Sequence, residues 1–355
     1  MSLSLSLFPA TRRRRPRLGT ALCAGLLAAL TITGLATAPQ AAALPPEEAS
    51  DATAEPGSRW VTADRQKVFE ISYPAEPGVT RLVNATIVVS QATDTEANGI
   101  GVSLGINCRT DGAQSESTGS IENVHRGQQI TLRPRMLYTP TSTGTVVCQL
   151  TQRGFIGAPD GTQTGVSRAA IENGSELRHS IGVRDTKQRT YTLPTKLSTK
   201  SAIVGFGQQW GEFPSVSYTV PEGKKGIEVM SDHKVTSCSY AGGSSDSTTD
   251  GKDLCTGFTG GKGASVEWFA YVTPLDAEGN ACAPKQTIIS RSRNVSLETH
   301  HASLYGTGTY ILPTTAGCTR NVRVKSYVRN PATYPGGASR FMIHATSERT
   351  AILPI

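Results

Sequence analysis

The segment VNATIVV, residues 83–89, places an apolar side chain at every second position. This period of two is typical of a β-strand that buries one of its faces. The same alternation returns in short runs bounded by Gly, Pro, Asn, Asp or Ser, whereas no stretch keeps a helical period over three capped turns. The pattern therefore predicts an all-β protein. The other runs include residues 69–73, 102–108, 146–150, 216–220, 266–272 and 322–324.

A weak internal repeat indicates how these strands are organised. ISY at 71–73 resembles VSY at 216–218, which lies 145 residues later. YTPTSTG at 138–144 resembles YILPTTAG at 310–317, with 173 residues between their prolines. We interpret the repeat as a duplication whose second copy has about 28 extra residues. Chance similarity among Thr- and Gly-rich strands is the alternative.

The duplication predicts two antiparallel β-sandwich domains of the Ig-like or jelly-roll-like kind. We assign residues 60–200 to the first domain and residues 201–355 to the second. The extra residues form an inserted loop around 224–260. The chain is long enough for two domains of ordinary size, each with its own core.

The N-terminus is predicted to be a cleaved signal peptide, residues 1–43. It joins an arginine run at 12–17 to an apolar stretch at 18–35 and ends in three alanines, a small-residue cleavage site. The apolar stretch is shorter than the roughly 20 residues of a membrane anchor. In composition the signal resembles those of high-GC actinobacteria. We therefore expect a secreted, extracellular protein without a membrane anchor.

Removal of the signal changes the charge of the chain. It takes away five arginines and no acidic residue, so the formal net charge falls from +7 to +2. Proteins that bind nucleic acid carry a strong basic footprint, and anionic membranes attract clustered Lys and Arg. The mature chain has neither feature. We expect no nucleic-acid partner and no membrane partner.

Residues 44–59 form an acidic leader that contains three prolines and a single leucine. Such a segment buries too little apolar surface to offset its ordering entropy, which predicts disorder. The leader is then either a spacer or an arm that orders when it docks into another secreted protein.

Six cysteines remain after the signal is removed, and an even set in an exported chain indicates disulfides. Spacing alone cannot select among the fifteen possible pairings. The repeat selects equivalent bridges across the two sandwiches, and the remaining pair would close the base of the inserted loop. The predicted disulfides are Cys108–Cys148, Cys282–Cys318 and Cys238–Cys255.

No motif in the sequence names a reaction. The Gly-x-Ser-x-Gly elbow of α/β-hydrolases is missing. His125, His179 and His233 are interpreted as surface or packing residues. His300 and His301 are neighbours on a predicted strand, where their rings would point to opposite faces and could not share a metal. We predict no catalytic, cofactor or metal site.

Calcium binding is a weaker possibility at three loops. Residues 94–99 begin like an EF-hand loop, but Gly105 stands where the bidentate glutamate belongs. Two other loops combine acidic residues with glycine, although Asp-Gly and Asn-Gly combinations also form ordinary turns. Their candidate ligands are Asp246, Asp250 and Asp253, and Asp276, Glu278 and Asn280.

Aromatic residues concentrate in the second half of the chain. Exposed rings could form a platform on which a sugar stacks, whereas rings that alternate along strands usually belong to a core. Glu267 is expected to face away from Trp268 and to pair with a neighbouring strand. The candidate rings are Trp210, Trp268, Phe269, Tyr271, Tyr305, Tyr310, Tyr327 and Tyr334.

The layout consists of a signal, a short leader, two disulfide-bonded β-domains and no catalytic constellation. It resembles the adaptor subunit of the secreted umbrella toxin particles of Streptomyces. This resemblance implies a non-catalytic, structural subunit of an extracellular assembly such as an antibacterial toxin particle. It also implies that residues 44–59 enter a trypsin-like lectin partner, and that a strand edge meets a large repeat-bearing subunit.

Two other function classes stay open. The chain could be a carbohydrate- or cell-wall-binding protein that uses its second domain. It could also be a secreted protease inhibitor that presents the loop at 241–253, or an enzyme of unfamiliar type.

Overall fold

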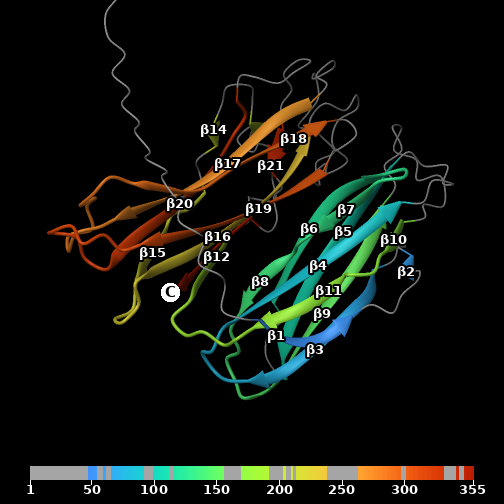
Figure 1. The fold of residues 1–355 in the computed structure, drawn as a ribbon, viewed down its shortest axis with the longest axis horizontal. Coiled ribbons are helices and arrows are strands. Elements are labelled where there is room, and N and C mark those ends of the chain that lie inside the picture. Colours follow the sequence, from blue (N-terminus) through green and yellow to red (C-terminus); the bar gives the residue numbers. More distant parts are fainter. Residues whose placement is uncertain are drawn as a thin grey trace, which may run out of the picture. The chain divides into compact units, whose positions relative to one another are not determined.

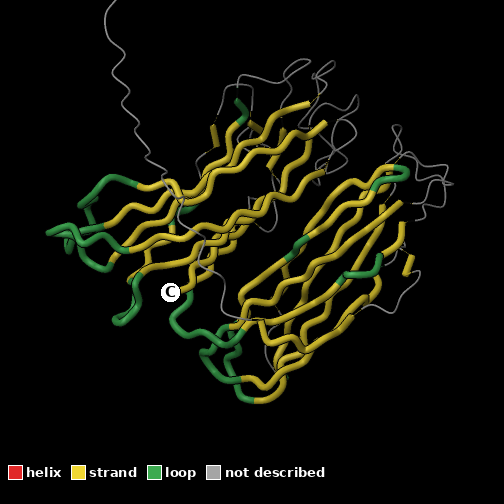
Figure 2. The backbone as a smooth tube through the Cα atoms, viewed as in Figure 1, coloured by secondary structure: helices red, strands yellow, loops and turns green. Residues whose placement is uncertain are grey.

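The computed structural model describes most of the chain from residue 47 onward. Every regular element in this part of the chain is a β-strand (Figures 1 and 2), which confirms the all-β prediction. The described residues contain no helix that could span a membrane. The predicted signal peptide, residues 1–43, lies outside it. The described ranges are 47–53, 59–60, 65–91, 99–111, 116–155, 169–191, 203–204, 209–210, 213–237, 263–296, 301–331, 341–343 and 348–355.

Strands β1 to β11 form the first sandwich. One sheet has the strand order β3-β9-β5-β6. The other has the order β1-β11-β4-β10-β2, with β7 and β8 also paired to β4. The strands are β1 (Glu47–Thr53), β2 (Arg59–Trp60), β3 (Gln66–Ala75), β4 (Arg81–Gln91), β5 (Gly99–Thr110), β6 (Glu116–His125), β7 (Gln129–Leu132), β8 (Arg135–Tyr138), β9 (Gly144–Phe155), β10 (Ala169–Ile171) and β11 (Glu176–Ser180).

Strands β12 to β22 form the second sandwich. One sheet has the order β14-β20-β17-β18, with β15 also paired to β20. The other has the order β12-β22-β16-β21-β13, with β19 also paired to β16. The strands are β12 (Lys187–Tyr191), β13 (Ile203–Val204), β14 (Gln209–Trp210), β15 (Val216–Thr219), β16 (Gly226–Ser237), β17 (Gly263–Pro274), β18 (Gln286–Ser296), β19 (His301–Ile311), β20 (Asn321–Arg329), β21 (Phe341–Ile343) and β22 (Glu348–Pro354).

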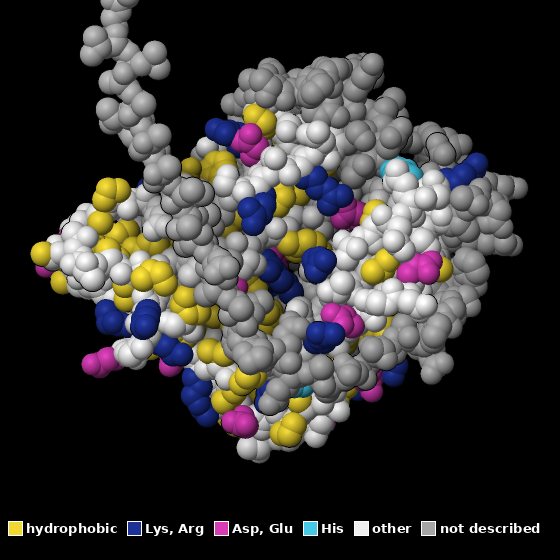
Figure 3. All heavy atoms as spheres, in the orientation of Figure 1, with side chains coloured by type: hydrophobic (Ala, Val, Ile, Leu, Met, Phe, Trp, Pro, Cys, Tyr) yellow, Lys and Arg dark blue, Asp and Glu magenta, His cyan; other side chains and the backbone are white. Residues whose placement is uncertain are grey.

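Each sandwich has its own core, built from the alternating residues that the sequence predicts. In β4, Val83, Ile87 and Val89 are 0% exposed and Ala85 is 3% exposed. They pack against the inward residues of β5 and β9 in one cluster. The inward residues of β16, β17 and β20 form a separate cluster. Lys and Arg side chains are interspersed with Asp and Glu on the face in view in Figure 3.

The topology confirms the duplication. The order β3-β9-β5-β6 recurs as β15-β20-β17-β18, and β1-β11-β4-β10-β2 recurs as β12-β22-β16-β21-β13. The register agrees as well, because Ile71 pairs with Cys148 where Val216 pairs with Val324. The turns that follow β3 and β15 both contain a glycine of positive φ, Gly78 at 74° and Gly223 at 79°. The repeat is therefore structural and not a chance similarity of sequence.

The structure corrects the predicted domain boundaries. Residues 47–53 of the leader form β1, which pairs with β11, so the first sandwich begins before residue 60. Residues 187–191 form β12, which pairs with β22, so the second sandwich begins before residue 201. Both strands lie at sheet edges. An edge strand is held by backbone hydrogen bonds, and it needs no apolar alternation of the kind that reveals a core strand.

The inserted loop also starts later than predicted. Residues 226–237 form β16, a central strand of the second sandwich and not part of a loop. The longer connection in the second copy is residues 238–262, between β16 and β17, where the first copy has only residues 92–98 between β4 and β5. The first boundary was wrong because β16 is polar at Ser231, Asp232, His233 and Lys234, so its apolar alternation is interrupted.

Two of the three predicted disulfides are present, Cys108–Cys148 and Cys282–Cys318. They do not occupy equivalent places in the two copies. Cys108 and Cys148 are direct neighbours on β5 and β9 of one sheet, so this bond does not cross the sandwich. The other disulfide ties the connection between β17 and β18 to the segment before β20. The predicted pair of Cys238 and Cys255 lies outside the described residues.

The open side of β15 is occupied by side chains of β12. Lys187 Nζ donates a hydrogen bond to the carbonyl of Ser217 at 2.8 Å. Arg189 donates another to the carbonyl of Ser215 at 3.2 Å. These residues therefore satisfy backbone acceptors that a neighbouring strand would otherwise satisfy.

Candidate functional sites

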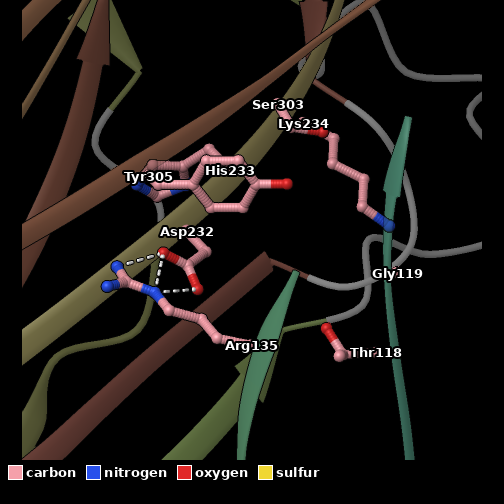
Figure 4. Close-up of a pocket in the computed structure, with 8 residues that line it drawn as sticks. All are labelled: Thr118, Gly119, Arg135, Asp232, His233, Lys234, Ser303 and Tyr305. Carbon is pink, nitrogen blue, oxygen red and sulfur yellow. Dashed lines mark hydrogen bonds and ion pairs between the residues drawn. The ribbon is translucent and has the colours of Figure 1, made fainter. Parts of the chain in front are cut away.

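The first candidate site is a polar joint between the two sandwiches (Figure 4). Arg135 on β8 donates from Nε to both carboxylate oxygens of Asp232 on β16, each at 3.1 Å, and from a terminal nitrogen to Oδ1 at 2.6 Å. The remaining donors of Arg135 reach Thr307 Oγ1 at 2.6 Å and the carbonyl of Gly306 at 2.7 Å. Both charged side chains are only 14% exposed.

The electrostatics of this joint favour a fixed charge state. Burial by itself lowers the pKa of Arg135, but the charge and hydrogen bonds of Asp232 outweigh it and raise that pKa. Burial raises the pKa of Tyr305 to about 12, although the hydrogen bond to Ser120 opposes the shift. Arg135 therefore stays cationic and Tyr305 stays protonated at neutral pH.

Further polar and apolar contacts join the same two sandwiches. On β19, Ser303 bonds both Ser120 Oγ and the backbone of Ile121 on β6. Arg293 on β18 forms an ion pair with the buried Glu122. An apolar cluster joins the same two sandwiches through Leu82, Leu137, Met230, Ala351 and Leu353.

The hollow beside Arg135 has a volume of about 10 Å³, room for about one water molecule. We therefore interpret the joint as a structural contact that fixes one sandwich against the other.

The second candidate site is an aromatic cluster on the outer face of the sheet β14-β20-β17-β18. Trp268 points into the core, so its neighbours on β17, Phe269 and Tyr271, point away from it. Tyr327 on β20 is the register partner of Phe269 and lies on the same face. The rings of Phe269 and Tyr327 are stacked with centroids 5.5 Å apart, and the centroid of Tyr271 lies 5.3 and 5.6 Å from theirs in edge-to-face arrangements.

Cations lie over each ring of this cluster. Lys285 Nζ is 4.4 Å from the centroid of Tyr271, and Lys325 Nζ is 5.2 Å from that of Tyr327. Arg329 lies 5.8 Å from the ring of Phe269 and forms an ion pair with Glu267. This pair confirms the role predicted for Glu267. We call the three rings and the cations over them the aromatic face.

A polar groove of about 780 Å³ lies where β15 pairs with β20, and its lining includes the carboxylates of Asp185 and Glu278. Arg323 lines it and lies on the outer face of β20, two residues before Lys325. One terminal nitrogen of Arg323 donates to the carbonyl of Gly279 at 3.1 Å. A guanidinium has five N–H donors, so this bond leaves donors that a ligand could use. Ser217, Thr219 and Asn321 supply further polar groups to the groove.

The structure separates the aromatic residues that the sequence grouped together. Trp268 and Tyr310 belong to the core cluster, and Tyr305 belongs to the joint. Among the candidate rings whose side chains the structure describes, those that meet on one outer face are Phe269, Tyr271 and Tyr327. Of Trp210 only the backbone is described, and Tyr334 lies outside the described residues.

The described histidines fit the packing interpretation. His179 is buried against the ring of Tyr73 at 4.6 Å, and His233 is buried against that of Phe213 at 4.7 Å. His301 is also buried, and its backbone nitrogen donates to Asn123 in the joint. His125 is partly buried, and its Nε2 atom has no hydrogen-bond partner.

The acidic loop at 276–280 is a turn held by its own hydrogen bonds. Asp276 Oδ1 accepts from the backbone nitrogen of Asn280 at 2.7 Å, and the two backbones bond at 2.9 Å. Within the described part of the chain, no three His, Cys, Asp or Glu side chains gather closely enough to hold a metal ion. The other two calcium candidates, residues 94–98 and the loop at 246–253, lie outside the described residues.

Sequence reasoning missed the joint and the cations of the aromatic face. The joint depends on which sheet faces of the two copies meet, which alternation alone does not reveal. Lys325 could have been found, because Lys325 and the predicted ring of Tyr327 alternate with the core residues Val324 and Val328 on β20 and must share its outer face. Lys285 comes from a loop, and its position has no such signal.

Comparisons with known proteins do not place the chain in a family. No protein-family model matches it, and no curated protein matches it. Among solved structures, the N-terminal CBM22-1-CBM22-2 tandem domain of Paenibacillus barcinonensis Xyn10C is 9% identical, with a TM-score of 0.22 over 79% of this chain and 82% of that one. The VP2 subviral particle of infectious bursal disease virus is 10% identical, with a TM-score of 0.23 over 84% of this chain and 74% of that one. TM-scores this low do not establish a shared fold.

Proposed function

We propose that the chain is a secreted glycan-binding protein that holds a saccharide on the aromatic face of its second sandwich. Sugar rings carry an apolar face of C–H groups, and aromatic side chains offer a flat apolar surface on which such a face stacks. Tyr271 and Tyr327, which are partly exposed on the outer face of the sheet, supply that surface, and Phe269, which is 9% exposed, packs against both. The two disulfides are consistent with an oxidising, extracellular location.

The duplication carries this proposal, because the first copy shows what the fold alone requires. The registers of the two copies match Leu104 to Trp268 and Gln152 to Val328. Phe269 and Tyr271 then correspond to Gly105 and Asn107, and Tyr327 corresponds to Thr151. The first sheet forms without rings at these places, so the rings are not needed to build the sheet. Ligand binding explains the presence of these rings, which the formation of the sheet does not explain.

The cations over the rings are compatible with stacking. A cation–π contact at an exposed site contributes only about 0.5–1 kcal/mol. A sugar ring can therefore displace the ammonium groups of Lys285 and Lys325 from the ring faces. Both groups sit on flexible stems and stay within reach of the polar groups of the sugar.

Replacing Tyr271 and Tyr327 together by alanine should weaken glycan binding about 10- to 100-fold, at roughly 0.5–1.5 kcal/mol for each ring contact. The measurement is a glycan array followed by titration of the strongest glycan. The matched control is Asn107→Ala with Thr151→Ala at the equivalent face of the first copy, which should leave binding unchanged. Unaltered binding by the tyrosine variant, with an unchanged melting temperature, would contradict the proposal.

A second function, the adaptor subunit of an extracellular assembly, is favoured by the pairing of β1. This strand comes from the leader and meets β11 in two short runs separated by a bulge between Glu48 and Ala52. A strand held mainly by backbone hydrogen bonds can be exchanged for, or extended by, a strand of a partner.

If the chain is an adaptor, its affinity purification from the culture supernatant of the producing bacterium should recover other secreted proteins in stoichiometric amounts. Deletion of residues 44–58 should release them. Mass spectrometry and light scattering would check both results. Recovery of the full chain alone, as a monomer, would count against an adaptor.

A further inference from the structure

The charges around the aromatic face are unbalanced. Within the described residues, Lys285 and Lys325 contact rings but form no ion pair, and Arg323 bonds only a carbonyl oxygen. By contrast, Arg329 forms an ion pair with Glu267 on the neighbouring strand, so its charge is compensated. Within the described residues, the ammonium groups of Lys285 and Lys325 therefore have no carboxylate paired with them, whereas Arg323 lines a groove that also holds the carboxylates of Asp185 and Glu278.

These cations lie in a row that a linear polymer could follow. Arg323, Lys325 and Tyr327 occupy alternate positions of β20, so they point to the same face at intervals of about 7 Å. Lys285 approaches the same place from the loop before β18, above Tyr271, which is the register partner of Lys325. The row ends at Arg323, which lines the polar groove.

The first copy again shows that the fold does not require these charges. Lys325 corresponds to Gln149, and Arg323 corresponds to Val147, when the registers of β20 and β9 are matched. Neither residue of the first copy is charged. The positive row and the rings thus occur together in the second copy, on the same strand, and both are missing from the equivalent strand of the first.

We propose that the ligand of the aromatic face is an anionic polysaccharide, whose rings stack on Tyr271 and Tyr327 while its carboxylate or phosphate groups bind Lys285, Lys325 and Arg323. This inference rests on the proposed glycan-binding function and adds the class of glycan. Ammonium and guanidinium groups bind both kinds of anion through charge-assisted hydrogen bonds. The two sources, a polyuronate and a phosphate-containing wall polymer, share this chemistry.

The test compares charged polymers with neutral matched forms. The probes are polygalacturonate and its methyl ester, and Gram-positive cell walls before and after hydrofluoric acid removes their phosphodiester polymers. The full chain should bind at least one charged probe tenfold more tightly than its neutral form. Tighter binding to polygalacturonate identifies carboxylate, and tighter binding to untreated walls identifies phosphate. Raising the salt from 50 to 500 mM should weaken the charged complex, because added ions screen exposed charges.

Two variants separate the charges from the rings. Lys285→Gln with Lys325→Gln should abolish the preference for the charged probe while keeping the binding to the neutral form. Tyr271→Ala with Tyr327→Ala should weaken both. Lys224→Gln removes an exposed lysine from the turn before β16 and should change neither, as the matched control.

Each outcome bears on one of the two proposals. Equal binding of charged and neutral probes by the full chain would overturn the anionic ligand and leave glycan binding intact, as would an unchanged preference in the lysine variant. Loss of binding to all probes in the lysine variant alone, with the tyrosine variant unaffected, would overturn the stacking function. A full chain that binds none of the four probes would overturn the anionic ligand, and a glycan array without any signal would overturn glycan binding as well.

Discussion

Arg135→Met should lower the free energy of unfolding by about 3–5 kcal/mol, the largest effect of any single change in the joint. The substitution leaves the carboxylate of Asp232 only 14% exposed and without its cation. It also removes the hydrogen bonds to Thr307 and to the carbonyl of Gly306. Equilibrium urea unfolding of both proteins, compared at a constant m value, measures the difference.

A second substitution distinguishes a buried unpaired charge from a general packing defect. Arg135→Met combined with Asp232→Leu should recover most of the lost stability, because an apolar pair can replace a buried ion pair at little cost. Arg329→Met breaks the more exposed pair with Glu267 and should cost no more than about 1 kcal/mol. A loss below 1 kcal/mol for Arg135→Met would show that the joint contributes little to folding.

Gly308→Ala should destabilise the second sandwich by about 3 kcal/mol, at the upper end of ordinary overpacking. Gly308 lies on β19 where β18 passes close by. A Cβ atom there would lie 2.1 Å from the carbonyl oxygen of Ile288 and 2.6 Å from its carbonyl carbon. Both atoms are backbone, so β18 would have to move and no side chain could rotate to make room.

Gly105→Ala is the matched control for this substitution. Its Cβ atom would come no closer than 3.3 Å to Thr151 Oγ1 and 3.4 Å to the carbonyl of Thr118. Thermal and urea unfolding should therefore show a change well below 1 kcal/mol for Gly105→Ala and a clear loss for Gly308→Ala. Equal effects of the two substitutions would mean that β18 yields without strain.

Much of the fold was predictable because each strand of a two-layer sandwich buries every second residue in the core. The runs at 83–89 and 266–272 are strands with buried inward positions, and the offset between 71–73 and 216–218 reflects a real duplication. The repeat led to the correct pairing of Cys108 with Cys148, although its premise of equivalent bridges was wrong, because this disulfide joins neighbouring strands of one sheet and is not equivalent to Cys282–Cys318.

What the sequence concealed depends on contacts that leave no period. The edge strands β1 and β12 are held through their backbones and lack apolar alternation, so β1 was predicted to be part of a disordered leader and β12 was placed in the first domain. The joint needs Arg135 and Asp232 to meet from two copies, and neither residue is distinctive alone. The aromatic face was predictable in part, since alternation along β17 places Phe269 and Trp268 on opposite faces of the sheet. Which rings share a face across two strands depends on the register.

The hydrogen bonds of Lys187 and Arg189 to the carbonyls of Ser217 and Ser215 have a consequence for the protein in bulk solution. An uncovered strand edge is a template on which a second molecule can continue the sheet, and this is a common start of aggregation. Two long cations placed over that edge both occupy its acceptors and repel the same edge of another copy. The edge of β15 is therefore a poor template for continuing this sheet with a second copy of the chain.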